Sequence, residues 1–135
     1  MEHLTEKFDA QSLNALSTLT LAHVGDGVYE LLARTHVARN GACRSKQMHS
    51  RTVALARAEA QSRAAHALIP HLTEEEQDVF RRGRNARPKT VPRHASSEEY
   101  AYATALEALF GWLYLSGRNE RVLALWEIAR EASEA

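Results

Sequence analysis

Residues 19–39, LTLAHVGDGVYELLARTHVAR, decide the fold, because their apolar side chains recur at helical spacing. Three- and four-residue steps connect Leu13, Leu16, Val24, Val28 and Leu31. This spacing predicts one amphipathic helix over about residues 14–39. The pair Asn40-Gly41 follows directly, and Gly or Asn after a periodic segment is a common helix end.

The residues after Gly41 also predict helices. An alanine-rich segment predicts a second helix over residues 45–68 that stops before Pro70. Thr73 and Glu76 have the spacing of a capping box, which predicts a short helix to about Arg82. The acids of its first turn suit the positive end of a helix.

Two further helices complete the sequence. Ser96 and Glu99 form a second capping box, which predicts a helix through Tyr114 that ends at Gly117. Asn119 is the expected cap of a last helix. Since no alternating strand pattern is present, the predicted fold class is all-α, a helical bundle.

Size and composition predict one domain over residues 1–135, with 44% hydrophobic and 25% charged residues. No apolar stretch approaches the roughly 20 residues of a membrane span, so no membrane partner is expected. The N-terminal MEHLTEKF lacks a signal-peptide core, which favours a cytoplasmic location. A single cysteine, Cys43, excludes an internal disulfide and a cysteine-rich zinc site.

Positive charge is concentrated in the middle of the chain, although the net charge is zero. Residues 34–93 hold thirteen Lys and Arg against five acids. Residues 83–95, with two prolines and no apolar periodicity, are expected to be a basic loop that binds phosphates or a merely solvated connection. The candidate phosphate-binding residues are Arg81, Arg82, Arg84, Asn85, Arg87 and Lys89, together with Arg51 of the second helix and its basic neighbours Arg44, Lys46 and Arg57.

Two acids lie in unusually apolar or small-residue surroundings. Asp26 lies between Gly25 and Gly27, and each mid-helix glycine costs on the order of 1 kcal/mol relative to alanine. Glu107 has Thr104 and other small residues on its helix face. A carboxylate in such a setting needs compensation, which a divalent cation supplies, although salt bridges to arginines are the plainer interpretation.

If the two helices cross at these acids, Asp26 and Glu107 form a candidate catalytic site that binds Mg²⁺, with Mn²⁺ as a substitute. Such a site suits phosphodiester hydrolysis. Glu30 and Thr104 would border the ion without binding it directly, and a salt bridge from Glu30 to Arg34 is the simpler role. The scattered histidines favour no zinc site, and the sequence has no nucleotide-phosphate loop.

Four segments resemble the ribonuclease III catalytic domain and, within that family, the Mini-III group, which lacks a double-stranded-RNA-binding domain. The segments are residues 21–26 (LAHVGD), 48–51 (MHSR), 81–86 (RRGRNA) and 104–111 (TALEALFG). Their order and spacing make the resemblance specific. In the family pattern two further acids accompany Asp26 and Glu107, and this chain has Ala22 and Thr104 at those positions.

The resemblance implies a homodimer that cuts double-stranded RNA and leaves 5′-phosphate ends, with Trp112 and Tyr114 as candidates for the dimer contact or for the core. It implies a large-subunit (23S) ribosomal RNA precursor as substrate and leaves room for a ribosomal-protein helper. Ala22 and Thr104 leave open a second hypothesis, a catalytically degenerate dimer that binds structured RNA as a ribosome-assembly factor. A protein-binding bundle without an RNA role is the remaining alternative.

Overall fold

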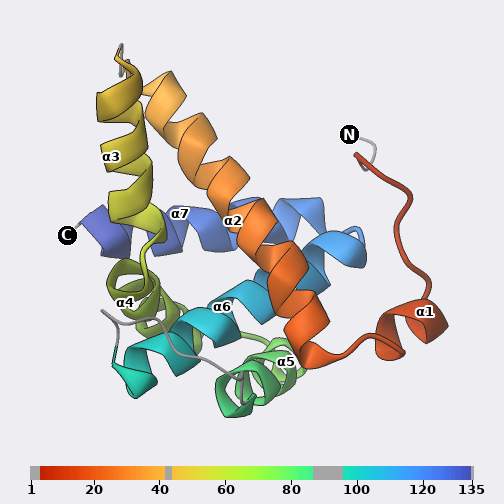
Figure 1. The fold of residues 1–135 in the computed structure, drawn as a ribbon. Helices are drawn as coiled ribbons and strands as arrows, with labels where there is room; N and C mark the ends of the chain where they lie inside the picture. The colour runs from red at the N-terminus through yellow and green to blue at the C-terminus, as the bar shows by residue number, and fades with distance from the viewer. Residues whose placement is uncertain (1–3, 42–43, 87–95, 135) are drawn as a thin grey trace.

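The computed structural model describes residues 4–41, 44–86 and 96–134. Within these ranges every regular element is helical, as the sequence predicts. Figure 1 shows the arrangement. The elements are α1 (Ala10–Asn14), α2 (Thr18–Arg39), α3 (Ser45–Ala56), α4 (Ala58–Leu68), the 3₁₀ turn η1 (Ile69–His71), α5 (Glu74–Asn85), α6 (Ser97–Leu115) and α7 (Asn119–Glu134).

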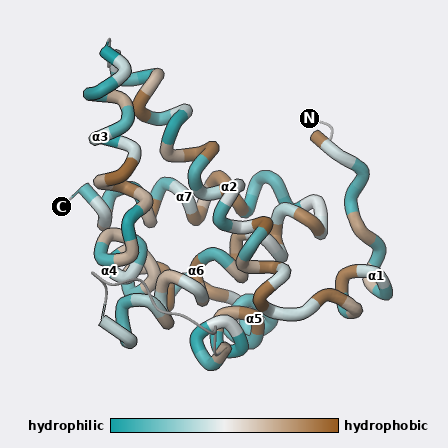
Figure 2. The backbone as a smooth tube through the Cα atoms, viewed as in Figure 1, coloured by the Kyte–Doolittle hydropathy of each residue, from teal (hydrophilic) through white to brown (hydrophobic). Residues whose placement is uncertain are grey.

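Helix α6 is the centre of the bundle. It packs against α2, α4 and α5, while α7 packs mainly against α4. Leu106, Leu109, Phe110 and Leu113 of α6 are completely buried. Hydrophobic segments gather in the interior where these helices meet, as Figure 2 shows. No helix of the described ranges is long and apolar enough to span a membrane.

Both predicted capping boxes are present. The Glu76 carboxylate accepts a hydrogen bond from the Thr73 backbone N–H at 2.9 Å, and Glu99 does the same for Ser96 at 3.1 Å. Gly117 follows α6 with φ of +78°, a left-handed conformation that glycine adopts without strain. The starts of α5 and α6 and the end of α6 are therefore set by local sequence.

The first predicted helix begins later than expected. Residues 10–14 form α1, and α2 begins only at Thr18. Ser17 is the N-cap of α2, since its hydroxyl accepts a hydrogen bond from the Thr20 backbone N–H at 3.1 Å. The predicted start at about residue 14 is wrong, because the Ser17 cap makes the helix begin at Thr18.

The second predicted helix, expected as a single helix over residues 45–68, is divided into two. Arg57 has an extended backbone with ψ of 157°, and it separates α3 from α4. Thr52 and Leu55 of α3 are buried, with α3 packed on α2, while α4 packs its alanines against α6 and α7. One straight helix could not make both contacts.

Helix α5 extends farther than predicted. Gly83, Arg84 and Asn85 belong to it, so the expected basic loop does not begin at residue 83. Gly83 explains the extension, because a Cβ there would lie 2.7 Å from the Cα of Ala105. The helix continues past Arg82 because a residue without a side chain lets it pack against α6. Cys43, Arg87 and Lys89 lie outside the described residues.

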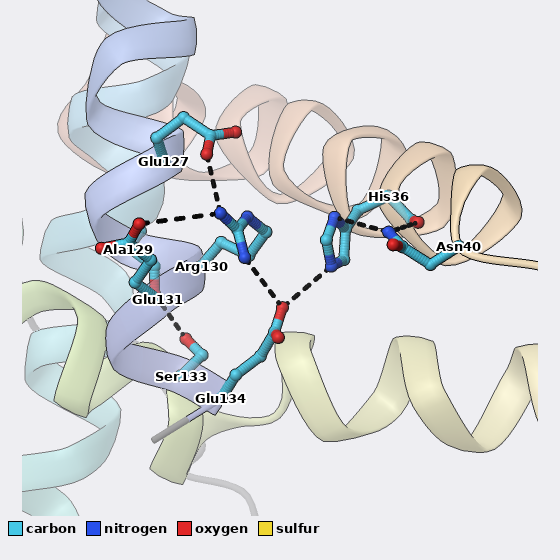
Figure 3. Close-up of polar contacts among 8 residues, drawn as sticks. All are labelled: His36, Asn40, Glu127, Ala129, Arg130, Glu131, Ser133 and Glu134. Atoms are coloured by element: carbon cyan, nitrogen blue, oxygen red, sulfur yellow. Dashed lines mark hydrogen bonds and ion pairs between the residues drawn. The ribbon is translucent and has the colours of Figure 1, made fainter.

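Polar contacts attach the end of α7 to α2 (Figure 3). His36 Nε2 lies 2.9 Å from a carboxylate oxygen of Glu134, and Arg130 contacts both Glu134 and Glu127. The Ser133 hydroxyl donates to the Ala129 carbonyl at 2.9 Å. The His36–Glu134 pair joins α7 to α2, while the other contacts lie within α7.

Candidate active site

Helices α2 and α6 touch backbone to backbone at two glycines. A Cβ on Gly25 would lie 1.6 Å from the carbonyl oxygen of Glu107, and one on Gly111 would lie 2.0 Å from that of Leu21. Such distances are far below van der Waals contact, so only glycine fits at either position. Gly27, by contrast, has open space around its Cα.

This close crossing brings Asp26 and Glu107 together. The two carboxyl groups lie close enough for the charge of Asp26 to act on Glu107. Burial, and after it the negative charge of Asp26, raises the pKa of Glu107 from its ordinary value of 4.5 to about 8. Asp26 lies toward solvent and Glu107 is half-buried. The predicted convergence of these two acids is therefore present in the structure.

Asp26 faces a cleft of about 500 Å³ between α2 and α3. Glu30, one turn after Asp26, lines the same cleft and forms an ion pair with Arg34 at 3.2 Å. This geometry matches the simpler of its two predicted roles. The other lining residues are Val37, Ser45, Met48, His49, Thr52, Val53, Ala56 and Arg57.

The residues at the two departures from the family pattern cannot replace the missing acids. Ala22 is buried and has no polar group. Thr104 is 5% exposed, and its hydroxyl donates to the Tyr100 carbonyl at 2.9 Å within α6. Thr104 therefore uses its hydroxyl proton within its own helix.

The predicted basic residues fall into two groups. Asp78 precedes the basic segment that begins at Arg81. It forms ion pairs with both Arg81 and Arg82 of α5. These two residues, like Arg84 and Asn85, are exposed but do not line the 500 Å³ cleft. On the other side, Arg51 is exposed on α3, while Arg57 and Arg34 lie in the cleft itself beside Asp26.

Gln61 is a site residue that the sequence reasoning missed. It lies on α4, is 3% exposed, and lowers the pKa of Glu107 against the larger effect of burial. The only signal in the sequence is a glutamine within an alanine-rich row. That signal gains meaning only when α4 is known to turn away from α3 and to pack on α6.

The acid pair fits a divalent ion. Among the described residues no group of three or more His, Cys, Asp or Glu side chains converges, so any ion held here depends on these two carboxylates. Mg²⁺ commonly takes one or two carboxylates and completes its shell with water and substrate phosphate. Because burial and the charge of Asp26 both oppose ionisation of Glu107, a cation at this place would stabilise the pair.

Comparison with known proteins agrees with this geometry. A family model described as the Ribonuclease III domain matches residues 19–118. A Mini-ribonuclease 3 of Symbiobacterium thermophilum is 42% identical over 119 residues, which are 88% of this chain and 92% of the relative. One from Gloeobacter violaceus is 47% identical over 111 residues, covering 82% of this chain and 81% of the relative. The crystal structure of protein FN1578 from Fusobacterium nucleatum matches with a TM-score of 0.81 and 31% identity, covering 89% of this chain and 96% of that one.

The chain therefore belongs to the ribonuclease III family. Within the family it falls in the Mini-ribonuclease III group, as the sequence segments predicted. Family membership makes it a hydrolase of RNA, an endoribonuclease that acts on double-stranded RNA. The family generally depends on divalent metal ions, which the acid pair in the cleft can accommodate.

Proposed function

We propose that residues 1–135 form one catalytic domain that cuts double-stranded RNA with Mg²⁺ held by Asp26 and Glu107. The observation that carries the proposal is the contact between these two carboxyls beside the α2–α3 cleft. When bound, Mg²⁺ would supply positive charge that stabilises the phosphoryl oxygens during hydrolysis. The expected products carry 5′-phosphate ends. Mn²⁺ is expected to substitute for it.

The protein's own side chains bind and orient the RNA. Arg57 and His49 line the cleft, where they can contact phosphates on either side of the scissile bond. Outside it, the proposed RNA-binding surface comprises Arg51, Arg81, Arg82, Arg84, Asn85, Arg87 and Lys89. With no separate RNA-binding domain in the matched region, affinity should depend steeply on salt.

We propose that a second copy of the chain covers the opposite side of α2. An apolar groove there has a volume of about 1650 Å³ and includes Val24, Val28 and Leu31 of α2 with Leu123 of α7. Leu31 and Leu123 are 57% and 56% exposed, an unusual state for leucines that face one groove. A dimer built here presents two clefts to one duplex.

The two aromatic candidates for the dimer contact differ in position. Trp112 is 7% exposed, lies in the core and carries the Arg118 guanidinium 4.4 Å from its ring centre. Tyr114 borders the groove, and its hydroxyl contacts Thr5 at 3.1 Å. Tyr114, and not Trp112, is thus the aromatic residue proposed for the interface.

As substrate we propose the helix formed by the ends of the large-subunit (23S) ribosomal RNA precursor, processed in the cytoplasm. The support is the resemblance to Mini-ribonuclease III. A ribosomal protein that presents this RNA is a further proposed partner.

Incubation with long double-stranded RNA and with precursor ribosomal RNA, in Mg²⁺ or EDTA, tests the proposal. The expected result is metal-dependent fragments with 5′-phosphate ends that Asp26→Asn and Glu107→Gln abolish while RNA binding persists. Arg39→Gln, an exposed change at the far end of α2, is the matched control. Cleavage that survives both acid substitutions would refute the proposed site.

The second candidate function is an RNA-binding assembly factor without catalysis. It is favoured by the two-acid site, since Ala22 offers no ligand and the Thr104 hydroxyl donates to Tyr100. Binding of both RNAs without any cleavage in Mg²⁺ or Mn²⁺ would support this function instead of the nuclease.

A further inference from the structure

Two arginines line the α2–α3 cleft, and they differ in their partners. Arg34 forms an ion pair with Glu30 at 3.2 Å, one turn away on α2. Arg57 is exposed, and across residues 4–41, 44–86 and 96–134 its guanidinium has no ion pair or hydrogen bond. Because a guanidinium remains charged at neutral pH, Arg57 brings an uncompensated positive charge to the cleft.

Arg57 lies at the level of Asp26, on the opposite wall of the cleft. The consecutive helices α2 and α3 run in opposite directions and diverge from the end where the chain connects them (Figure 1). Val37 and Ser45 line the cleft near that end. Asp26 is 11 residues from Val37, and Arg57 is 12 residues from Ser45, so each lies about 17 Å farther along its helix. The acid and the arginine therefore face each other where the cleft is open.

His49 lies at a different level of the same wall. It is four residues after Ser45, about one helical turn from the connected end, and so it lies near the level of Arg34. A phosphate beside Asp26 would be about two helical turns from His49. Among the described lining residues, Arg57 is thus the basic side chain at the level of Asp26.

The backbone of Arg57 is fixed on both sides. Its N–H donates to the Val53 carbonyl at 2.9 Å, and its carbonyl accepts a hydrogen bond from the Gln61 N–H at 2.9 Å. Arg57 ends α3 and precedes α4, but its side chain makes no capping hydrogen bond. Binding of an anion would therefore cost the conformational entropy of this side chain and little backbone entropy.

We propose that Arg57 is a catalytic residue whose guanidinium binds the non-bridging oxygens of the scissile phosphate, opposite the acid pair. The proposal rests on the nuclease function proposed above. In that hydrolysis a water oxygen bonds to phosphorus and gives a proton to solvent. The bond from phosphorus to the 3′ oxygen breaks, and the 3′ oxygen keeps the electron pair and takes up a proton. The planar fork of arginine matches two phosphate oxygens and stabilises their charge in the transition state.

The two departures from the family pattern give this arginine a reason. Ala22 has no polar group and the Thr104 hydroxyl is used within α6, so the α2–α6 crossing offers one pair of carboxylates. Such a pair suits a single divalent ion. Arg57 adds positive charge from the α3 wall without needing an acid to hold it.

Single-turnover cleavage of a short RNA duplex with one mapped cut, at saturating protein in Mg²⁺, measures the role of Arg57. Arg57→Gln should lower the rate by about 100–1000-fold. Its RNA affinity in EDTA should fall by less than about tenfold, since one phosphate contact of several is lost. Arg57→Lys keeps the charge without the fork and should give an intermediate loss. Arg39→Gln, at an exposed arginine of α2 that does not line the cleft, is the matched control and should cut at the unsubstituted rate.

Sulfur substitution shows which phosphate Arg57 contacts. Sulfur in place of one non-bridging oxygen of the scissile phosphate weakens a hydrogen bond to that position. For one of the two stereoisomers, Arg57→Gln should therefore slow cleavage much less than it does on unmodified RNA, as in a double-mutant cycle. Sulfur at a neighbouring phosphate should leave the full loss.

The outcomes distinguish this role from the proposed function. If Arg57→Gln cuts at the unsubstituted rate while Asp26→Asn is inactive, the role of Arg57 is wrong and the nuclease stands. A loss confined to RNA affinity, or one relieved only by sulfur at a neighbouring phosphate, would overturn the catalytic role as well. If the unsubstituted protein cuts no RNA, both proposals fall. If circular dichroism shows that Arg57→Gln does not fold, Arg57→Lys must still slow the saturated rate with the same dependence on the stereoisomer.

Discussion

Two sides of helix α2 differ in the charge of their side chains and in the cavity that each side borders. The side toward α3 carries Asp26, Glu30 and Arg34 and borders a cleft of about 500 Å³. The other side carries Val28 and Leu31 and borders an apolar groove more than three times as large. One helix thus presents charges to a candidate substrate and apolar side chains to a candidate partner subunit.

The two glycines beside Asp26 show how these sides are kept distinct. Gly25 lies against α6, where its missing Cβ allows the backbones to touch and brings Glu107 to Asp26. Gly27 borders the groove and touches nothing within 4 Å of its absent Cβ. Only the first glycine is required by the fold of the single chain.

Gly25→Ala is expected to give the largest effect. The new Cβ would meet the backbone of Glu107 at 1.6 Å, which no side-chain movement relieves, so unfolding free energy should fall by more than about 3 kcal/mol. Gly27→Ala should stay within about 1 kcal/mol of the unsubstituted protein. Urea denaturation measures both, and equal effects would contradict the difference between the two positions.

Local signals in the sequence predicted much of this structure correctly. The capping boxes at Thr73 and Ser96 set helix starts through hydrogen bonds within four residues. Asp26 and Glu107 were predicted as a pair on the condition that their helices cross at these acids, and the structure brings the two carboxyl groups close together. Each of these features depends on neighbours in the chain or on a single packing contact.

Features determined by distant contacts could not be predicted in the same way. No proline or glycine marks the break at Arg57, which follows from α3 and α4 packing on different helices. Gln61 becomes a site residue only through that break. Glycine at position 83 indicated a loop, whereas its actual role is close packing against Ala105.

A charge placed on the apolar side of α2 should break the proposed dimer and leave the cleft intact. Leu31→Arg buries an unpaired cation in the interface, so the dissociation constant should rise by at least about 100-fold, close to 3 kcal/mol. Sedimentation velocity measures it, with Ala38→Arg at another exposed residue of α2 as control. A chain that is monomeric without the substitution would refute the proposed interface.

The acid pair predicts that the metal-free protein loses stability as the pH rises. A carboxyl whose pKa is raised by folding gives its full stabilisation below its unfolded value, here 4.5, and loses it as the pH passes the folded value, here about 8. In EDTA the unfolding free energy should fall by about 2 kcal/mol over this window, after allowance for partial solvent screening.

Glu107→Gln removes this titration, so its stability should vary less with pH than that of the unsubstituted protein. Mg²⁺ should reduce the loss near pH 8, because a bound cation stabilises the ionised form of Glu107. Thermal unfolding in EDTA from pH 5 to 8.5 provides the measurement. Parallel curves for the two proteins would show that Glu107 titrates normally.

The smallest expected effect on stability concerns Tyr29, a core residue of α2. Tyr29 is completely buried between Phe110 and Trp126, and its hydroxyl, although near Ser133, makes no hydrogen bond of normal geometry. Burial raises the pKa of Tyr29 to about 12, which keeps the hydroxyl neutral beside Glu107. Tyr29→Phe retains both edge-to-face ring contacts and removes a poorly paired polar group, so stability should increase by about 1 kcal/mol. Chemical denaturation in EDTA measures the change. A loss of 1 kcal/mol or more would mean that the hydroxyl has a bound partner.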